Sequence, residues 1–180
     1  MQFKSTIVVF LGATGLMASP VQDGDNLAVR GYVELDRKPA SDGNGTLIFL
    51  GSKDDGNVKR NAFVEPRTSC KSNPAPKCSS DHAARNDVCD SLITELFADP
   101  TISVGESPRQ ICYQGSSGDN SYCCVSWHDV VPNLNKGDLA PVAQKIQQKC
   151  TQNGISGKTD GVKLYKTCTD VCLSNRGTHC

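Results

Sequence analysis

The sequence has no excess of either charge. Its 19 lysine and arginine residues equal its 19 aspartate and glutamate residues, and it has only three histidines. The chain therefore lacks the basic character typical of nucleic-acid binding or of attachment to acidic membranes. Long apolar runs are also missing, because the clearest one, residues 7–17, is well short of the roughly 20 residues that a membrane-spanning helix needs. We expect no nucleic-acid partner and no integral membrane segment.

Aromatic residues are scarce as well. They make up 6% of the chain, and Trp127 is the single tryptophan. A chain of 180 residues has room for one domain plus processing segments. One domain with so few large side chains builds a modest apolar core. Additional stabilisation must come from another source.

Cysteine is absent before residue 70, and ten cysteines then follow. An even number at this density is typical of a disulfide framework formed in an oxidising compartment. A metal site is not indicated, because there is no C-x2-C pair and His179–Cys180 is the only close combination of cysteine with histidine. The sequence predicts five disulfides of open connectivity and no cofactor. The cysteines are Cys70, Cys78, Cys89, Cys112, Cys123, Cys124, Cys150, Cys168, Cys172 and Cys180.

The N-terminus has the layout of a secretory signal peptide. Lys4 precedes the apolar run of residues 7–17, and the small residues Ala18 and Ser19 follow it. We predict that residues 1–18 are a signal peptide cleaved near Ala18. The mature protein is then secreted and extracellular.

Residues 19–60 form a cysteine-free stretch rich in Asp and Gly. It ends at Lys59 and Arg60, a dibasic pair that resembles a processing site of secretory pathways, with cleavage after Arg60. The segments 27–35 and 46–51 flank a turn cluster and predict a β-hairpin, which would have to lean on the rest of the protein to be stable. We expect either a pro-segment or an N-terminal β-hairpin extension. Asn44, in the turn, begins the only Asn-x-Thr sequence and is the predicted glycosylation site.

Residues 61–180 are predicted to form the cysteine-rich domain, with two helices. Asn86 or Asp87 can cap the first helix, which ends at Asp99–Pro100. Asp138 is the expected cap of the second helix, with Pro141 in its first turn and Asn153–Gly154 as its stop. The polar face of the first helix holds Asp90 and Glu95. The apolar faces are predicted to hold Val88, Cys89, Leu92, Leu96 and Phe97 in the first helix, and Leu139, Val142, Ile146 and Cys150 in the second.

Segments with strand character surround these helices. Residues 109–115 and 121–127 read as a hairpin, residues 161–173 as a later strand, and a further strand is expected near residues 61–66. The resulting order is β-α-β-β-α-β. It predicts an α+β fold, a small disulfide-rich α/β sandwich whose antiparallel sheet carries two helices on one face.

The adjacent cysteines Cys123 and Cys124 lie within the predicted strand 121–127. Successive side chains of a strand point to opposite faces of the sheet, so the two thiols are expected to form separate disulfides. Val125 and Trp127 share the face of Cys123, and we therefore assign that face to the core. Cys124 should reach across the sheet or to a loop.

Residues suited to catalysis are few. The sequence GISGKT, residues 154–159, resembles a phosphate-binding loop, but Gln152 stands where that loop needs glycine, and we interpret the segment as a turn. The one acid–base assembly worth naming is His128–Asp129 beside Trp127, with Glu95, Arg109 and His82 as further members. Neighbouring residues of a strand face opposite ways, so we interpret these side chains as surface polar residues. No catalytic residue and no enzymatic activity are expected.

Six stretches between Cys78 and Cys180 form a distinctive combination: NDVCDSLITEL, SPRQIC, YCCVSW, GDLAPVAQKIQQKC, NGISG and VCLSNRGTHC. Through them, this part of the chain resembles the WD-like domain of secreted ascomycete proteins. The resemblance implies secretion by a fungus, five disulfides and no assigned enzymatic activity. Ser126, Trp127, Asn175 and Arg176 match the family pattern, in which Trp127 would serve as core and residues 174–177 as a terminal turn. The chain is not a WD40 propeller, because it lacks repeats of about 40 residues.

These observations favour an effector-like or virulence-associated binding protein that acts outside the cell as a monomer on an unknown host or microbial target. A killer-type antimicrobial toxin is the alternative, based on the expected order of elements together with the disulfides and the dibasic site. A secreted ribonuclease or other hydrolase is a third and weaker interpretation.

Overall fold

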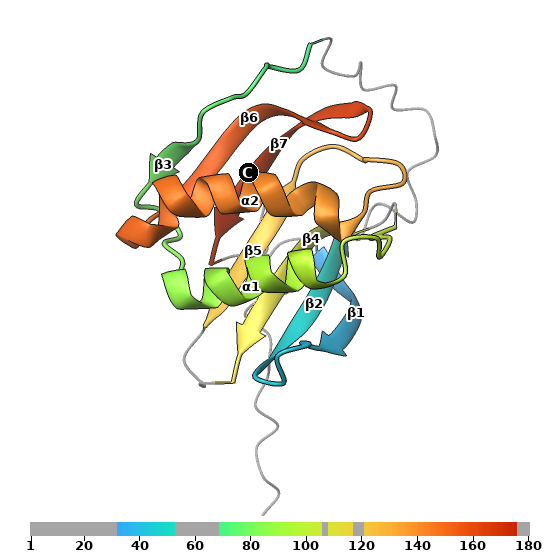
Figure 1. The fold of residues 1–180 in the computed structure, drawn as a ribbon, viewed down its shortest axis with the longest axis vertical. Helices are drawn as coiled ribbons and strands as arrows, with labels where there is room; N and C mark the ends of the chain where they lie inside the picture. Colours follow the sequence, from blue (N-terminus) through green and yellow to red (C-terminus); the bar gives the residue numbers. More distant parts are fainter. Residues whose placement is uncertain (1–31, 53–68, 106–107, 117–120, 176–180) are drawn as a thin grey trace, which may run out of the picture.

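A computed structural model of the chain describes residues 32–52, 69–105, 108–116 and 121–175. These residues form one antiparallel sheet of seven strands in the order β1-β2-β4-β5-β7-β6-β3, with helices α1 and α2 packed on one face (Figure 1). The strands are β1 (Tyr32–Pro39), β2 (Gly45–Ser52), β3 (Lys77–Ser79), β4 (Pro108–Gly115), β5 (Tyr122–Trp127), β6 (Ser156–Leu164) and β7 (Thr167–Ser174). The helices are α1 (Asn86–Ala98) and α2 (Lys136–Lys149), and the 3-10 turn η1 (Thr151–Asn153) follows α2.

The α+β class and the antiparallel sheet agree with the prediction, but the order of elements differs from it. The segment predicted as one late strand forms most of a hairpin, β6 and β7, joined at Tyr165 and Lys166. Tyr165 has a positive φ of 51°, a conformation that usually needs Gly or Asn, so a turn could not be predicted there from the residue type. The 154–159 segment interpreted as a turn is largely the start of β6. The strand expected near residues 61–66 lies outside the described residues.

Helix α1 is close to its predicted bounds. Its N-cap is Arg85 rather than Asn86 or Asp87, and it ends before Pro100. Ile93 is buried, whereas Phe97, assigned to the apolar face, is 46% exposed. Ile93 lies four residues after Cys89 and remains on the helix face that points at the sheet. Phe97 lies four residues further along, and because residues four apart are slightly rotated around the helix axis, it falls beside that face. The polar assignment of Glu95 is also wrong, because Glu95 is only 2% exposed.

Helix α2 begins earlier than predicted. Its N-cap is Asn135, and Asp138 occupies the third helical position, where its carboxylate accepts the Asn135 backbone N–H at 2.9 Å. This is a capping box, in which the acidic residue caps from inside the helix. Pro141 therefore lies in the second turn, not the first. Gly154, with a φ of +73°, terminates the following 3-10 turn as expected.

The core lies between the helices and the sheet. Trp127, Leu92, Leu139 and Ile146 are at most 2% exposed and belong to one large apolar cluster. The predicted alternation of side chains along β5 is confirmed. This cluster contains Cys123, Val125 and Trp127, whereas Cys124 belongs to a smaller cluster on the opposite face of the sheet. The smaller cluster consists of Ile48, Leu50, Cys112, Tyr122 and Cys124.

The predicted N-terminal hairpin is present as β1 and β2. The described part of β1 begins at Tyr32, and residues 27–31 of the predicted first strand lie outside the described residues. Strand β2 pairs on its other side with β4, in register from Gly45–Gly115 to Leu50–Gln110 and with a shift before Gly51–Pro108. The hairpin thus leans on the cysteine-rich domain by extending its sheet, which supplies the third strand that an isolated hairpin lacks.

Candidate functional site

A cluster of charged side chains lies on the sheet face that carries no helices, near the β3 edge. The Cα of Gly157 faces α2, where an added Cβ would meet the Ile146 side chain at 2.4 Å. Lys158 is the next residue of β6 and therefore points to the opposite face. Strand pairing places Lys158 between Lys77 of β3 and Cys172 of β7. Local strand geometry thus directs polar groups from three strands to one place.

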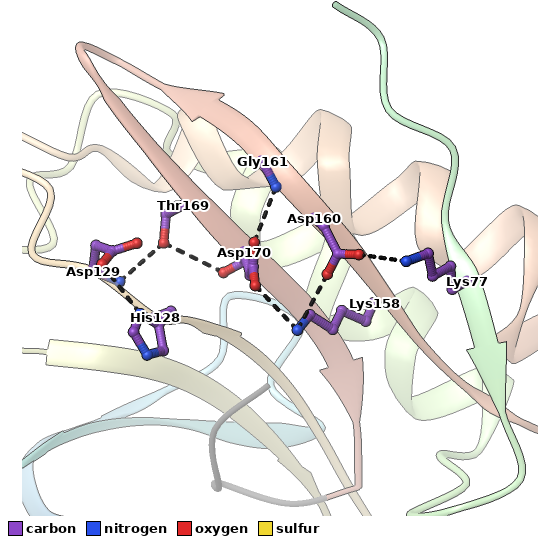
Figure 2. Close-up of polar contacts among 8 residues, drawn as sticks. All are labelled: Lys77, His128, Asp129, Lys158, Asp160, Gly161, Thr169 and Asp170. Atoms are coloured by element: carbon purple, nitrogen blue, oxygen red, sulfur yellow. Dashed lines mark hydrogen bonds and ion pairs between the residues drawn. The ribbon is translucent and has the colours of Figure 1, made fainter. Parts of the chain in front are cut away.

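The cluster is a chain of alternating charges, which we call the β6 charge network: Lys77, Asp160, Lys158 and Asp170. Figure 2 shows the Lys158 ammonium between two carboxylates, 3.1 Å from Asp160 and 3.0 Å from Asp170. The second carboxylate oxygen of Asp160 lies 2.8 Å from the Lys77 ammonium. The Asp170 side chain is 5% exposed, whereas that of Lys77 is 74% exposed. The network therefore runs from the buried sheet to the surface.

Contacts within the network shift the pKa values of Asp160 and Lys158. Hydrogen bonds from Lys77 and Lys158, opposed by partial burial, hold the pKa of Asp160 below its usual value. Burial disfavours the Lys158 ammonium, but its hydrogen bonds to Asp170 and Asp160 outweigh burial and raise its pKa. Asp160 and Lys158 therefore favour their charged forms at neutral pH.

Asp170 also has a structural task. Its other carboxylate oxygen accepts the Gly161 backbone N–H at 3.0 Å, at a break in the β6–β7 register. Gly161 has a φ of +69°, and the extra residue of such a bulge leaves backbone groups outside the ladder. The buried carboxylate supplies the acceptor that the strand cannot. The network thus fixes the bulge as well as exposing charge.

The assembly considered for hydrolysis is brought together only in part. His128 Nδ1 lies 3.1 Å from the Asp129 carboxylate, contrary to the expectation that the two side chains face opposite ways (Figure 2). The expectation failed because β5 ends at Trp127 and the strand alternation ends with it. An Arg109 guanidinium N–H donates to the His128 carbonyl, and the Asp129 backbone N–H donates to Thr169 Oγ1 at 2.9 Å.

Glu95 is engaged at the hairpin turn instead. One of its carboxylate oxygens accepts the backbone N–H groups of Ser41 at 2.8 Å and Asp42 at 3.3 Å, and also the Ser41 hydroxyl. The backbone carbonyl of His82 accepts the Asn175 N–H at 3.1 Å. The hydrogen bonds of Glu95 and of the His82 carbonyl are thus made to residues other than His128 and Asp129. Among the described residues, no group of three or more His, Cys, Asp or Glu side chains is placed to hold a metal ion.

Replacing Glu95 with Gln is expected to lower the free energy of unfolding by about 1–2 kcal/mol, because neutral hydrogen bonds replace charge-assisted ones in a buried place. Glu34→Gln is the matched control, since Glu34 pairs with Arg37 on the exposed strand β1 and little change is expected there. Urea titrations of both variants make the comparison. If both variants lost the same free energy of unfolding, burial of the Glu95 carboxylate would have no energetic consequence.

Asp160→Asn is expected to lower the free energy of unfolding by about 1 kcal/mol at pH 7. The carboxylate pKa is lowered in the folded protein, so its contribution is present above the unfolded value of about 3.9 and is lost as pH falls through the folded value. The difference between variant and wild type should therefore shrink in acid. Asp87→Asn, at an exposed pair with Arg85, should change little. A difference that persists in acid would contradict the assignment.

The cysteines of the described residues are all disulfide-bonded. Cys89 of α1 bonds to Cys123, and Cys112 to Cys124 directly across β4 and β5, so the adjacent thiols serve different bonds as predicted. Cys172 is disulfide-bonded as well, whereas Cys180 lies outside the described residues. Two further bonds within the described part of the chain are Cys70–Cys168 and Cys78–Cys150.

The other predicted sites are placed unevenly. Asn44 is exposed in the turn between β1 and β2, where an enzyme can reach it, and its glycosylation stays a prediction. The signal peptide and the pair Lys59–Arg60 lie outside the described residues. The β6 charge network was missed, because only the chain's pairing brings residues 77, 158–160 and 170 together. The charged sequence GKTDG was the one signal that could have drawn attention to it.

Comparison with known proteins gives one match. A family model described as Fungal WD-like matches residues 57–180, which include α1, α2, β3 to β7 and all ten cysteines. No curated protein and no solved structure matches the chain. The matched region covers well over half of the sequence and contains the stretch that carries the resemblance. The chain therefore belongs to the fungal WD-like family.

Proposed function

We propose that this protein is a secreted, non-enzymatic fungal binding protein, effector-like or virulence-associated, that acts outside the cell. The observation that carries the proposal is the set of disulfides. They join residues up to 98 positions apart and connect α1 and α2 to the sheet. Such bonds form and persist in oxidising compartments and stabilise a small domain against unfolding and proteolysis. No helix among the described residues is long and apolar enough to cross a membrane.

The two edges of the helix-free sheet face are the surfaces that we propose for target binding, because the middle of that face is occupied by the buried cluster of Ile48, Leu50, Cys112, Tyr122 and Cys124. The opposite face is occupied by α1 and α2, whereas Lys77 and Arg37 extend partly exposed from the strands near the two edges of the sheet. Charges of both signs accompany them, in the β6 charge network at one edge and in the Glu34–Arg37 pair at the other. A polar, mixed-charge surface suits recognition of a folded protein better than recognition of a polyanion.

The function is tested by infiltrating the refolded mature protein into host tissue and by deleting the gene in the producing fungus. We expect a host response to the protein and reduced infection by the deletion strain. Absence of both results would remove the proposal. Growth assays on yeasts, fungi and bacteria run in parallel, because inhibition there would favour the killer-type toxin instead. A hydrolase would require activity that is lost in His128→Ala.

The binding face is tested separately with Lys77→Gln. Lys77 is exposed on β3, and its loss should weaken the host response while leaving the fold intact. Lys149→Gln is the matched control, because Lys149 is exposed on α2 at the helix side of the molecule. A response that depends equally on both lysines, or on Lys149 alone, would contradict the assignment of the face.

A further inference from the structure

The β1–β2 hairpin is built into the sheet without a covalent cross-link. No cysteine precedes Cys70, so no disulfide can connect residues 1–60 to the rest of the protein. The hairpin is held instead by the ladder between β2 and β4, which extends from Gly45–Gly115 to Gly51–Pro108. Figure 1 shows the hairpin continuing the sheet beyond β4. Apart from the connecting chain, only non-covalent contacts therefore join the hairpin to the rest of the sheet.

These contacts are extensive and use both faces of β2. Leu47 and Phe49 enter the main core beneath the helices, at 4% and 6% exposure. Ile48 and Leu50 enter the smaller cluster on the opposite face, at 0% and 2%. Burial of four large apolar side chains is worth about 1.5–3 kcal/mol each before the cost of ordering the chain. A strand that is apolar on both faces behaves as a central strand of the sheet.

A polar contact fixes the turn of the hairpin in addition. The buried Glu95 carboxylate of α1 accepts the N–H groups of Ser41 and Asp42, as described above. The Tyr113 hydroxyl of β4 donates to the Asp42 carboxylate at 2.8 Å. A Cβ on Gly45 would meet the Tyr113 ring at 2.3 Å, so glycine permits this close approach. The turn is thus recognised by side chains of two other elements.

The hairpin also changes the character of the sheet edge. Without it, β4 would be an edge strand with the buried residues Ile111, Cys112 and Tyr113 at its centre. The actual edge, β1, carries the exposed sequence ELDRKP from Glu34 to Pro39 and a register shift between Glu34 and Asp36. Charges, proline and bulges are the features with which proteins prevent pairing at an edge. The hairpin therefore covers the β4 edge, which is suited to pairing with another strand. The new edge is β1, which resists such pairing.

The family comparison separates the same two parts. The matched region begins at residue 57, after the hairpin has ended at Ser52. We propose that the β4 edge, with Glu95 and Tyr113, is a strand-addition site of this fungal WD-like domain, and that its occupant is the β1–β2 hairpin of this chain. The hairpin binds as a ligand of the domain and stays bound when the chain between them is cut. Main-chain hydrogen bonds supply affinity at such sites, and side-chain pockets supply specificity.

The test uses the full chain with a flexible linker and a specific protease site inserted between Gly56 and Asn57. After cleavage, we expect both fragments to elute together in native size-exclusion chromatography at micromolar concentration. Denaturant should separate them with all disulfides intact. Fragments that separate without denaturant would overturn the proposal, as would a hairpin whose removal leaves the thermal stability of the remaining fragment unchanged.

A variant tests the recognition of the turn. In the cut protein, Glu95→Ala should weaken retention of the hairpin by about tenfold or more, because the backbone N–H groups of Ser41 and Asp42 lose their buried acceptor. Asp36→Ala, whose carboxylate pairs with Lys38 within the exposed strand β1, should leave retention unchanged. Ser41→Ala, which removes one hydroxyl donor at the surface, serves if Glu95→Ala does not fold, and it should weaken retention by a smaller factor. Equal retention by all variants would refute the role of Glu95.

Discussion

Replacing both Cys89 and Cys123 with Ala is expected to lower the free energy of unfolding by about 4 kcal/mol, from the loop-closure entropy of cysteines 34 residues apart. Both sulfurs are fully buried in the main core, where the bond joins α1 to the central strand β5. Small domains are stable by only about 5–15 kcal/mol in total. The variant should therefore unfold at a much lower urea concentration, or fail to accumulate.

The matched control is the pair Cys112→Ala and Cys124→Ala. This bond closes a loop of only 12 residues between strands that are already paired, so we expect a loss of about 3 kcal/mol. Urea unfolding followed by circular dichroism gives both values. A larger loss for Cys112–Cys124 than for Cys89–Cys123 would show that loop length does not decide how much these two bonds stabilise the protein.

Trp127→Ala is expected to lower the free energy of unfolding by about 3–5 kcal/mol, the usual result of truncating a large buried aromatic side chain. Trp127 is 2% exposed, and it lies where β5 meets Val171 of β7. Because the side chain is buried, we interpret its presence as a requirement of the core and expect no direct role in target binding.

Phe97→Ala is the control for Trp127→Ala. Phe97 is an aromatic residue of α1 that is 46% exposed, so its truncation should change stability by less than about 0.5 kcal/mol. Thermal unfolding monitored by circular dichroism measures both variants without relying on the tryptophan signal. If the Trp127 variant retained full stability but lost the host response, the residue would belong to the binding site and not to the core.

The sequence predicted those features that depend on local spacing. The alternation of β5 assigned Cys123 to the core and Cys124 to the other face, and the helical spacing around Cys89 identified the buried side of α1. These assignments succeeded because they follow from the period of each element alone. The α+β class followed in the same way from the alternation of helical and strand segments.

Other features depend on residues that are distant in the sequence. Glu95 looks like a surface residue in its helix, and its burial follows from a turn 53 and 54 residues away. The β6–β7 hairpin turns at Tyr165, where neither Gly nor Asn announces a positive φ. His128 and Asp129 contact each other because the strand ends one residue earlier. In each case tertiary structure decided what local pattern could not.

The hairpin illustrates the same limit. Its two strands and its turn could be recognised from the sequence, and so could its need for support. Its insertion against β4 could not, because strand order within an antiparallel sheet is not encoded in the pattern of a single strand. The structure of the whole domain is therefore needed to choose between a pro-segment and a β-hairpin extension that remains part of the fold.

We propose that disulfides, formed outside the cytosol, hold this small domain together. The test is alkylation of the native secreted protein without reductant, followed by intact mass and by mapping of the bonded peptides. We expect that none of the ten cysteines reacts and that Cys89–Cys123 and Cys112–Cys124 are recovered as separate pairs. If most cysteines were modified while the protein remained folded, the disulfides could not be what holds the domain together.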